Sequence, residues 1–151
     1  MRAVLDMAQV VVRPLTTGDA PAVAELCGQL GYPGTAEQLA QRIQRSNHSE
    51  DRSIFGALLY GEFAGWIDAT VERHLQSEDI VVIGGLVVRE SVRGRGLGKR
   101  LCEAVEQWAR ERGFQRVRVR SQIKRDDAHR FYLQNQYRQV KTSLVFEKNL
   151  E

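Results

Sequence analysis

The stretch from Ile80 to Arg112 constrains the fold more than any other part of this chain. It opens with an unbroken run of apolar and glycine residues, Ile80–Val88, which predicts a strand covered on both faces. A glycine-rich loop follows, and Leu97–Arg112 then has the apolar spacing of a helix. Such a strand–loop–helix unit brings loop amides and the positive end of a helix dipole together. The sequence therefore predicts an anion-binding loop from Arg93 to Lys99.

The apolar patterns in the rest of the chain predict an α/β (α+β) fold. One mixed sheet of about seven strands is expected, with helices on both faces, in the order β-α-α-β-β-β-α-β-α-β-β. Gly84-Gly85 inside a strand predicts a bulge or a close approach by a ligand, and residues 73–79 predict a polar turn. Strands are expected at 9–13, 53–60, 63–72, 80–88, 116–120, 137–140 and 143–146, and helices at 17–30 (N-cap Thr17), 35–46 (capping box Thr35–Gln38), 97–112 and 126–136.

Residues 1–151 are expected to form a single domain. Residues 1–8 are expected to be a disordered leader, and whether Met1 or Met7 is the natural start is left open. A composition of 42% hydrophobic and 27% charged residues is ordinary for a soluble globular protein. No apolar run approaches the roughly 18 to 20 residues that span a bilayer, and the first residues lack the apolar core of a secretory signal.

The two cysteines, Cys27 and Cys102, lie far apart at apolar helical positions. They are expected to be buried free thiols, which favours a cytoplasmic location. The three histidines, His48, His74 and His129, have no metal-ligand spacing, so no metal is expected.

Positive charge is concentrated between Arg89 and Arg125, where twelve Arg and Lys accompany four acidic residues. This excess predicts a polyanionic ligand nearby, although solvated helix and strand faces would give the same pattern. Binding of nucleic acid is not expected, because no set of aromatic residues alternates with these charges.

The spacing of the glycines separates three kinds of phosphate-binding loop. A P-loop requires G-x-x-x-x-G-K-[ST], but with Gly98-Lys99 at its end, Arg93 replaces the first glycine and Arg100 replaces Ser or Thr. A dinucleotide loop requires G-x-G-x-x-G. Counted from Gly94, Lys99 stands in place of the third glycine, and counted from Gly96, Leu101 does. The third pattern, [Q/R]-x-x-G-x-[G/A], is matched in full by Arg93-Gly94-Arg95-Gly96-Leu97-Gly98.

This loop and its surroundings resemble the GNAT superfamily of N-acetyltransferases. The resemblance runs from about Gln9 to Leu150, and its other parts are the strand Leu86-Val87-Val88, the helix 97–112, a strand ending at Ser121, and Asp127-Ala128-His129-Arg130-Phe131-Tyr132. The closing segment with Phe146-Glu147-Lys148 is similar to the small-molecule branch, which includes aminoalkylphosphonate and aminoglycoside N-acetyltransferases. The resemblance implies the GNAT fold and an acetyl-CoA-dependent N-acetyltransferase.

The resemblance also implies where acetyl-CoA binds as co-substrate. It would lie where strands 80–88 and 116–120 splay apart, with the Val88 amide polarising the thioester carbonyl and Tyr132 acting as general acid to the sulfur. An amine then attacks the thioester directly through a tetrahedral intermediate. The residues expected at the cofactor are Leu86, Val87, Val88, Arg93, Gly94, Arg95, Gly96, Leu97, Gly98, Lys99, Ser121, Asp127, His129 and Tyr132.

The general base is left open by the sequence. Many relatives place a glutamate near the position of Val82, but here Ile80–Val88 has no carboxylate. A water chain is one alternative, and the other candidates are Asp68, Glu72, His74, Glu78 and Asp79.

The acceptor is expected to be a primary amine of a small molecule, bound near Tyr32, Trp66 and Asp68. An aminoglycoside would favour an acidic pocket and a phosphonate would favour arginines, and the sequence offers both. Two other functions stay open, acetylation of a peptide or protein and non-catalytic sensing of acetyl-CoA. No membrane partner is expected, and a homodimer is expected because dimers are common in the superfamily.

Overall fold

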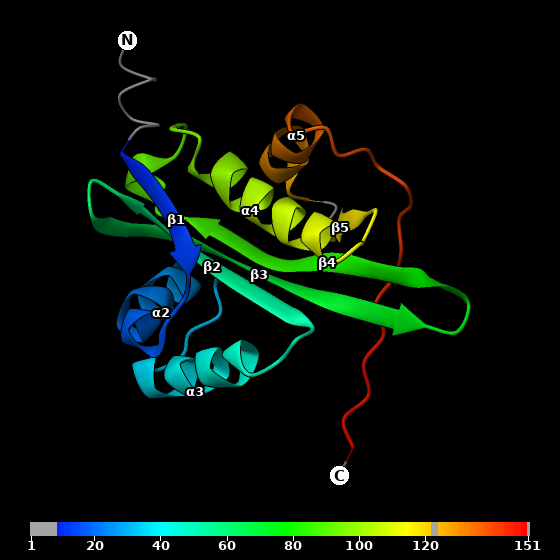
Figure 1. Cartoon of the computed structure of the whole chain (residues 1–151), viewed down its shortest axis with the longest axis horizontal. Coiled ribbons are helices and arrows are strands. Elements are labelled where there is room, and N and C mark those ends of the chain that lie inside the picture. The colour runs from blue at the N-terminus through cyan, green and yellow to red at the C-terminus, as the bar shows by residue number, and fades with distance from the viewer. Residues whose placement is uncertain (1–8, 122–123, 151) are drawn as a thin grey trace. The chain divides into compact units, whose positions relative to one another are not determined.

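The computed structural model describes residues 9–121 and 124–150, and the chain divides into two compact units at Arg120/Ser121. The predicted leader, residues 1–8, lies outside the described residues, and a single 1–151 domain stays a prediction. The first unit contains the sheet and most of the helices (Figure 1), and the second contains helix α5 (Asp126–Gln134). The elements of the first unit are β1 (Val10–Pro14), η1 (Thr17–Asp19), α2 (Ala20–Gln29), α3 (Ala36–Asn47), β2 (Arg52–Leu59), β3 (Glu62–His74), β4 (Ser77–Val88), η2 (Glu90–Val92), α4 (Leu97–Glu111) and β5 (Val117–Val119), where η marks a 3-10 helix.

The strands form one mixed sheet in the order β1-β2-β3-β4-β5. The first four are antiparallel neighbours, and β5 runs parallel to β4. Residues Ile80–Ile83 of β4 are at most 5% exposed. This burial confirms that both faces of the central strand are covered there.

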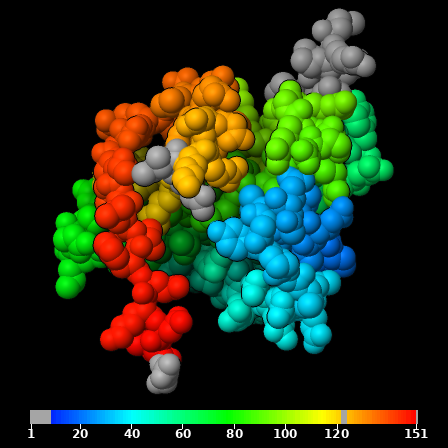
Figure 2. All heavy atoms as spheres, turned by 180° about the vertical axis from the view of Figure 1, so that it is seen from behind, coloured from blue at the N-terminus to red at the C-terminus, as the bar shows by residue number. Residues whose placement is uncertain are grey.

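Helices α2 and α3 cover one face of the sheet. Leu15, Val23, Leu39, Ile43 and Ile54 are buried together between these helices and β2. The predicted capping box of α3 is confirmed, because Thr35 Oγ1 accepts from the Gln38 amide while Gln38 Oε1 accepts from the Thr35 amide, both at 3.1 Å. In Figure 2, α2 and α3 (blue to cyan) form one continuous region of the surface.

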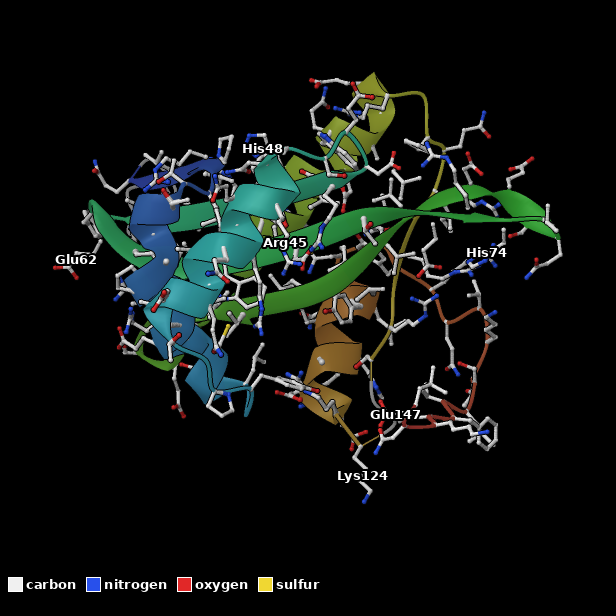
Figure 3. The ribbon with its side chains drawn as sticks, turned by 90° about the horizontal axis from the view of Figure 1, so that it is seen from below. Arg45, His48, Glu62, His74, Lys124 and Glu147 are labelled. Carbon is white, nitrogen blue, oxygen red and sulfur yellow. The ribbon has the colours of Figure 1, made fainter. Side chains whose placement is uncertain are left out.

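Helix α4 covers the opposite face, which confirms the prediction of helices on both sides (Figure 3). Leu97, Leu101 and Val105 are at most 1% exposed, and the helix packs on β2, β3 and β4. Burial of each such side chain is worth about 1.5–3 kcal/mol. Gly113 follows the helix with a φ of 85°, as expected for a C′ glycine.

The predicted bulge at Gly84-Gly85 is confirmed. Ile83 pairs with Ala69 and Gly85 pairs with Asp68, so Gly84 is an extra residue in β4. A bulge of this kind disrupts the ladder and bends the strand.

The predicted polar turn at residues 73–79 is wrong. Strands β3 and β4 continue as a ribbon, and only Leu75-Gln76 form the turn. Arg73 pairs with Asp51 at 2.6 Å and with Asp79 at 3.2 Å. Arg73 on β3 thus pairs with Asp79 on β4 and with Asp51 just before β2, in a polar ribbon that local propensity assigns to a turn.

The predicted N-cap Thr17 is also wrong, because Thr16 precedes the short η1 helix. Asp19 accepts from the Thr16 amide at 2.9 Å and from both terminal nitrogens of Arg13 at 2.7 and 2.9 Å. Asp19 therefore ties the start of this helical segment to β1.

The sheet has five strands in the described parts of the chain, fewer than the seven predicted. Residues 137–140 and 143–146 have no regular secondary structure, and residues 138–150 are all exposed. A strand forms only where a neighbouring strand shares its hydrogen bonds, and a local sequence pattern does not show whether such a neighbour is present. Among the helices that the structure describes, none is long and apolar enough to cross a bilayer.

Candidate functional site

In the described residues, no strand pairs with the β5-facing edge of β4 beyond Ile83, and the Val88 carbonyl on this edge accepts from the side chains of Gln29 and Arg93. Strand β5 pairs only with Val81–Ile83. On the other side of β4, the Arg89 amide donates to the Ala64 carbonyl at 2.7 Å. Because successive amides of a strand point to opposite edges, the amides of Val88 and Leu86 face the side that β5 leaves open. The strand thus offers amides to a ligand that lies along it.

The glycine loop lies directly after this open edge. Gly94 and Gly96 have φ angles of 84° and 81°, which residues with a Cβ rarely adopt. Gly96 is the N-cap of α4 and supplies no side-chain cap, and the first turn of α4 has no acidic residue. Left-handed residues beside a helix N-terminus form concave sets of amides that bind anions.

The side chains of the loop divide into an exposed and a buried set. Arg93, Arg95 and Lys99 are exposed around it, whereas Leu97 and Gly98 are buried in α4. The exposed cations can attract a polyanion, and Leu97 can contribute only its backbone to a ligand.

The junction between the open edge and the loop is fixed by residues that the sequence reasoning missed. Arg89 Nη1 pairs with Glu25 at 2.8 Å, and Arg89 Nη2 donates to the Phe63 carbonyl at 3.2 Å. Gln29 Nε2 donates to the Val88 carbonyl at 2.9 Å. Glu25 and Gln29 belong to α2, far away in sequence, and no local pattern in the chain signals these contacts.

Asp68 and Trp66 lie beside the bulge on the face covered by α2 and α3. Asp68 pairs with Gly85, and the ring of Trp66 is so close that a Cβ on Gly85 would lie 3.0 Å from it. Trp66 packs against the α2–α3 core, but its buried indole N–H has no hydrogen-bond partner among the described residues. Such donors are uncommon and can mark a ligand site. Tyr32 is 69% exposed in the α2–α3 loop.

The candidate bases on β3 and β4 are engaged in ion pairs. Arg120 binds both carboxylate oxygens of Glu72 at 2.8 and 2.9 Å, and this pairing lowers the Glu72 pKa to about 2. Arg52 Nη2 contacts both oxygens of Asp68 at 2.6 and 2.8 Å. The carboxylates of Glu78 and Asp79 pair with Arg116 and Arg73, respectively.

Most of these groups are also remote from the open edge. Glu72 pairs with Ile80, which lies about 20 Å along the strand from Leu86 at about 3.3 Å per residue. His74 lies at the far end of the ribbon, opposite the end that carries Glu62 (Figure 3). Of the candidates, Asp68 alone adjoins the open segment. In the described parts of the chain, no three His, Cys, Asp or Glu residues are grouped to hold a metal.

The remaining predicted cofactor residues, Ser121, Asp127, His129 and Tyr132, belong to the second unit. Tyr132 lies on α5 with its ring 5.2 Å from that of Phe131 and 5.8 Å from that of Tyr137, both edge to face. His129 Nδ1 is 4.0 Å from Asp126. The roles of these residues stay predictions.

Replacing Arg120 with glutamine should raise the pKa of Glu72 from about 2 toward the unperturbed value of about 4.3. Because folding lowers this pKa, the pair stabilises the fold above about pH 4 and loses that effect as the pH falls toward 2. A carbon-13 NMR titration of the Glu72 carboxyl measures the shift. Arg116→Gln, which removes the partner of Glu78, is the control. A Glu72 pKa that stays near 2 in Arg120→Gln would contradict this assignment.

Two curated relatives resemble the chain in sequence. Over 84 residues, which are 55% of this chain, it is 39% identical to the aminoalkylphosphonate N-acetyltransferase of Salmonella typhimurium. The chain spans about half of that relative's length, 54%. It is 28% identical over 112 residues to an uncharacterised N-acetyltransferase of Bacillus subtilis, covering 74% of this chain and 76% of the relative.

Solved structures of aminoglycoside N-acetyltransferases share the fold. The enzyme AAC(6')-Iy, solved in complex with CoA, superposes with a TM-score of 0.83 at 17% identity over 93% of this chain and 95% of its own. An aminoglycoside acetyltransferase from a soil metagenome, solved in complex with sisomicin, superposes with a TM-score of 0.78 at 21% identity. The superposition covers 96% of this chain and 99% of that structure. The profile of the acetyltransferase (GNAT) family matches residues 23–136. The chain therefore belongs to the GNAT acetyltransferase family.

Proposed function

We propose that this protein transfers the acetyl group of acetyl-CoA to a primary amine of a small molecule. The observation that carries the proposal is the open edge of β4, which leads directly into a loop with two left-handed glycines at a helix N-terminus. One segment of chain thus offers amides to an extended ligand and then to an anion. Acetyl-CoA has this sequence of parts, a pantetheine arm followed by a diphosphate.

Acetyl-CoA would bind by main-chain contacts along this segment. The pantetheine arm pairs with Leu86, Val87 and Val88 like an added strand. The diphosphate accepts from the amides between Arg93 and Lys99, whose cations surround it. Ser121, Asp127 and His129 of the second unit are proposed as further contacts.

The transfer would be a direct displacement. The amine nitrogen attacks the thioester carbonyl carbon, and the Val88 amide stabilises the oxyanion that forms. The C–S bond then breaks, and Tyr132 protonates the departing thiolate. The amine loses its extra proton to water, because the pKa of Glu72 is about 2 and Asp68 is held by Arg52.

The acceptor would lie beside the bulge, near Asp68, Trp66 and Tyr32. The Asp68 carboxylate can bind an ammonium, and the free indole N–H of Trp66 can donate to an oxygen. Because Arg52 already neutralises Asp68, an acceptor with an amine and an anionic group fits this place better than a polycation. The name of the Salmonella relative makes aminoalkylphosphonates the first acceptors to test.

A thiol-release assay with acetyl-CoA should therefore detect turnover with aminoalkylphosphonates before aminoglycosides, polyamines, amino acids or peptides. In the same assay Tyr132→Phe should lower kcat by about 100-fold, the usual worth of a general acid, without weakening acetyl-CoA binding. Tyr60→Phe, in an exposed turn, is the control. An unchanged kcat would remove Tyr132 from the mechanism. Binding of acetyl-CoA without turnover of any amine would favour a sensor instead.

Replacing Gly96 with alanine should weaken acetyl-CoA binding by about tenfold or more, because a Cβ at positive φ strains the loop and occupies the path of the diphosphate. Gly113→Ala is a matched control, since Gly113 has a φ of 85° against 81° and is equally free of close neighbours. Calorimetric titration of both variants separates the effects. Equal affinities would show that the loop does not hold the diphosphate.

We also propose a cytoplasmic homodimer. The two free cysteines in the described chain, Cys27 and Cys102, are buried thiols, which suits a reducing compartment. The exposed segment 138–150 displays apolar side chains that a second copy could cover. These are Val140, Leu144, Val145, Phe146 and Leu150, each at least 55% exposed.

Analytical ultracentrifugation at micromolar concentration should therefore detect a dimer. A double replacement of Leu144 and Phe146 with glutamate should shift it to monomer, because the two side chains are 77% and 87% exposed in the single chain. Leu75→Glu, at a fully exposed hairpin turn, controls for the loss of an exposed apolar residue. A monomeric wild type would overturn the dimer.

A further inference from the structure

The side-chain amide of Gln29 connects the end of α2 to the end of β4. Its Nε2 donates to the Val88 carbonyl at 2.9 Å, and its Oε1 accepts from the Glu90 amide at 3.1 Å. These partners lie 59 and 61 positions away in sequence. Gln29 is the last residue of α2, and Tyr32 follows three positions later in the exposed α2–α3 loop.

The two hydrogen bonds require one donor and one acceptor on the same planar group. A side-chain amide can donate to a carbonyl and accept from an N–H at the same time, whereas a carboxylate can only accept. A glutamate at position 29 would keep an acceptor for the Glu90 amide but would place a carboxylate oxygen against the Val88 carbonyl. An alanine would lose both contacts.

The two atoms that Gln29 holds flank the proposed reaction centre. The N–H and C=O of one residue point to the same edge of a strand, so the Val88 carbonyl that Gln29 binds lies on the same edge as the Val88 amide. Glu90 begins η2, which leads to the glycine loop. Arg89 is held on the other side of the strand by the Ala64 and Phe63 carbonyls.

We propose that Gln29 is a positioning residue that fixes the Val88 amide where the thioester oxyanion forms and links its position to the α2–α3 loop. The role rests on the proposed acetyl transfer. Gln29 would act through the main chain, because both of its hydrogen bonds are made to main-chain atoms. A shift in the α2–α3 loop on acceptor binding would therefore be transmitted through Gln29 to the Val88 amide.

The test compares Gln29→Glu, Gln29→Ala and Gln44→Ala, an exposed glutamine of α3 that serves as control. Both changes at position 29 should lower kcat by about tenfold, because small displacements of an oxyanion donor are costly. Acetyl-CoA affinity should stay within about threefold of wild type and the melting temperature within about four degrees, since the two hydrogen bonds of an exposed side chain add little to stability. Gln44→Ala should match the wild type throughout.

Hydrogen exchange at the Glu90 amide gives a readout that does not need turnover. Exchange should accelerate in Gln29→Ala and remain protected in Gln29→Glu, which keeps the acceptor oxygen. If wild type acetylates no amine, the proposed function fails, while the exchange data still show whether Gln29 holds the junction. A kcat within twofold of wild type in both variants, or a kcat loss matched by loss of binding and of melting temperature, would overturn the positioning role.

Discussion

The site depends on one interruption in the sheet, the separation of β4 from β5 after Ile83. Strand β5 ends its pairing at Val119, and the extra residue Gly84 bends β4 at the same level. Unpaired amides in the middle of a sheet are costly when buried, and an edge that a ligand can complete avoids that cost. The strand is thus paired with β3 along its length to Val88 and with β5 only up to Ile83, so one edge is available to a ligand from Gly84 onward.

Several of the cationic side chains between residues 89 and 125 form ion pairs within the protein. Of the cations between residues 89 and 125, Arg89, Arg116 and Arg120 are paired with Glu25, Glu78 and Glu72. These pairs join α2, the ribbon and the end of β5, so their main contribution is to geometry. The exposed cations beside an anion-binding arrangement of amides are those of the glycine loop. A general polyanion surface over the whole segment is therefore a less suitable description than a single phosphate site.

The sequence was sufficient where local chemistry decides the structure. The strand 80–88, the glycine loop, helix 97–112, the capping box at Thr35 and the bulge at Gly84 each depend on residues close to one another in the chain. It was insufficient where the partner is remote. The polar ribbon around Arg73 is formed by backbone pairing of β3 with β4, with Arg73 bound to Asp79 and Asp51. Segment 143–146 has a strand-like composition but no regular secondary structure.

The candidate site shows the same division. The amides of Leu86 to Lys99 could be predicted because they follow from a motif, whereas Gln29 could not, since its partners are main-chain atoms about 60 residues away. Asp68 and Trp66 could be named from the sequence, but their position beside Gly85 follows only from the register of β3 against β4. Side chains that act through tertiary register are therefore the part of this site that sequence patterns leave undetermined.

A site built mainly from the main chain, as proposed above, would be compatible with low sequence identity. The superposition with an aminoglycoside N-acetyltransferase reaches a TM-score of 0.83 at 17% identity. Main-chain amides place few demands on residue type beyond glycine where φ is positive, as at Gly94 and Gly96, and a buried anchor such as Leu97. The proposed acceptor residues around Asp68 would face no such constraint, so acceptor specificity could change while the strand, the loop and the helix are kept.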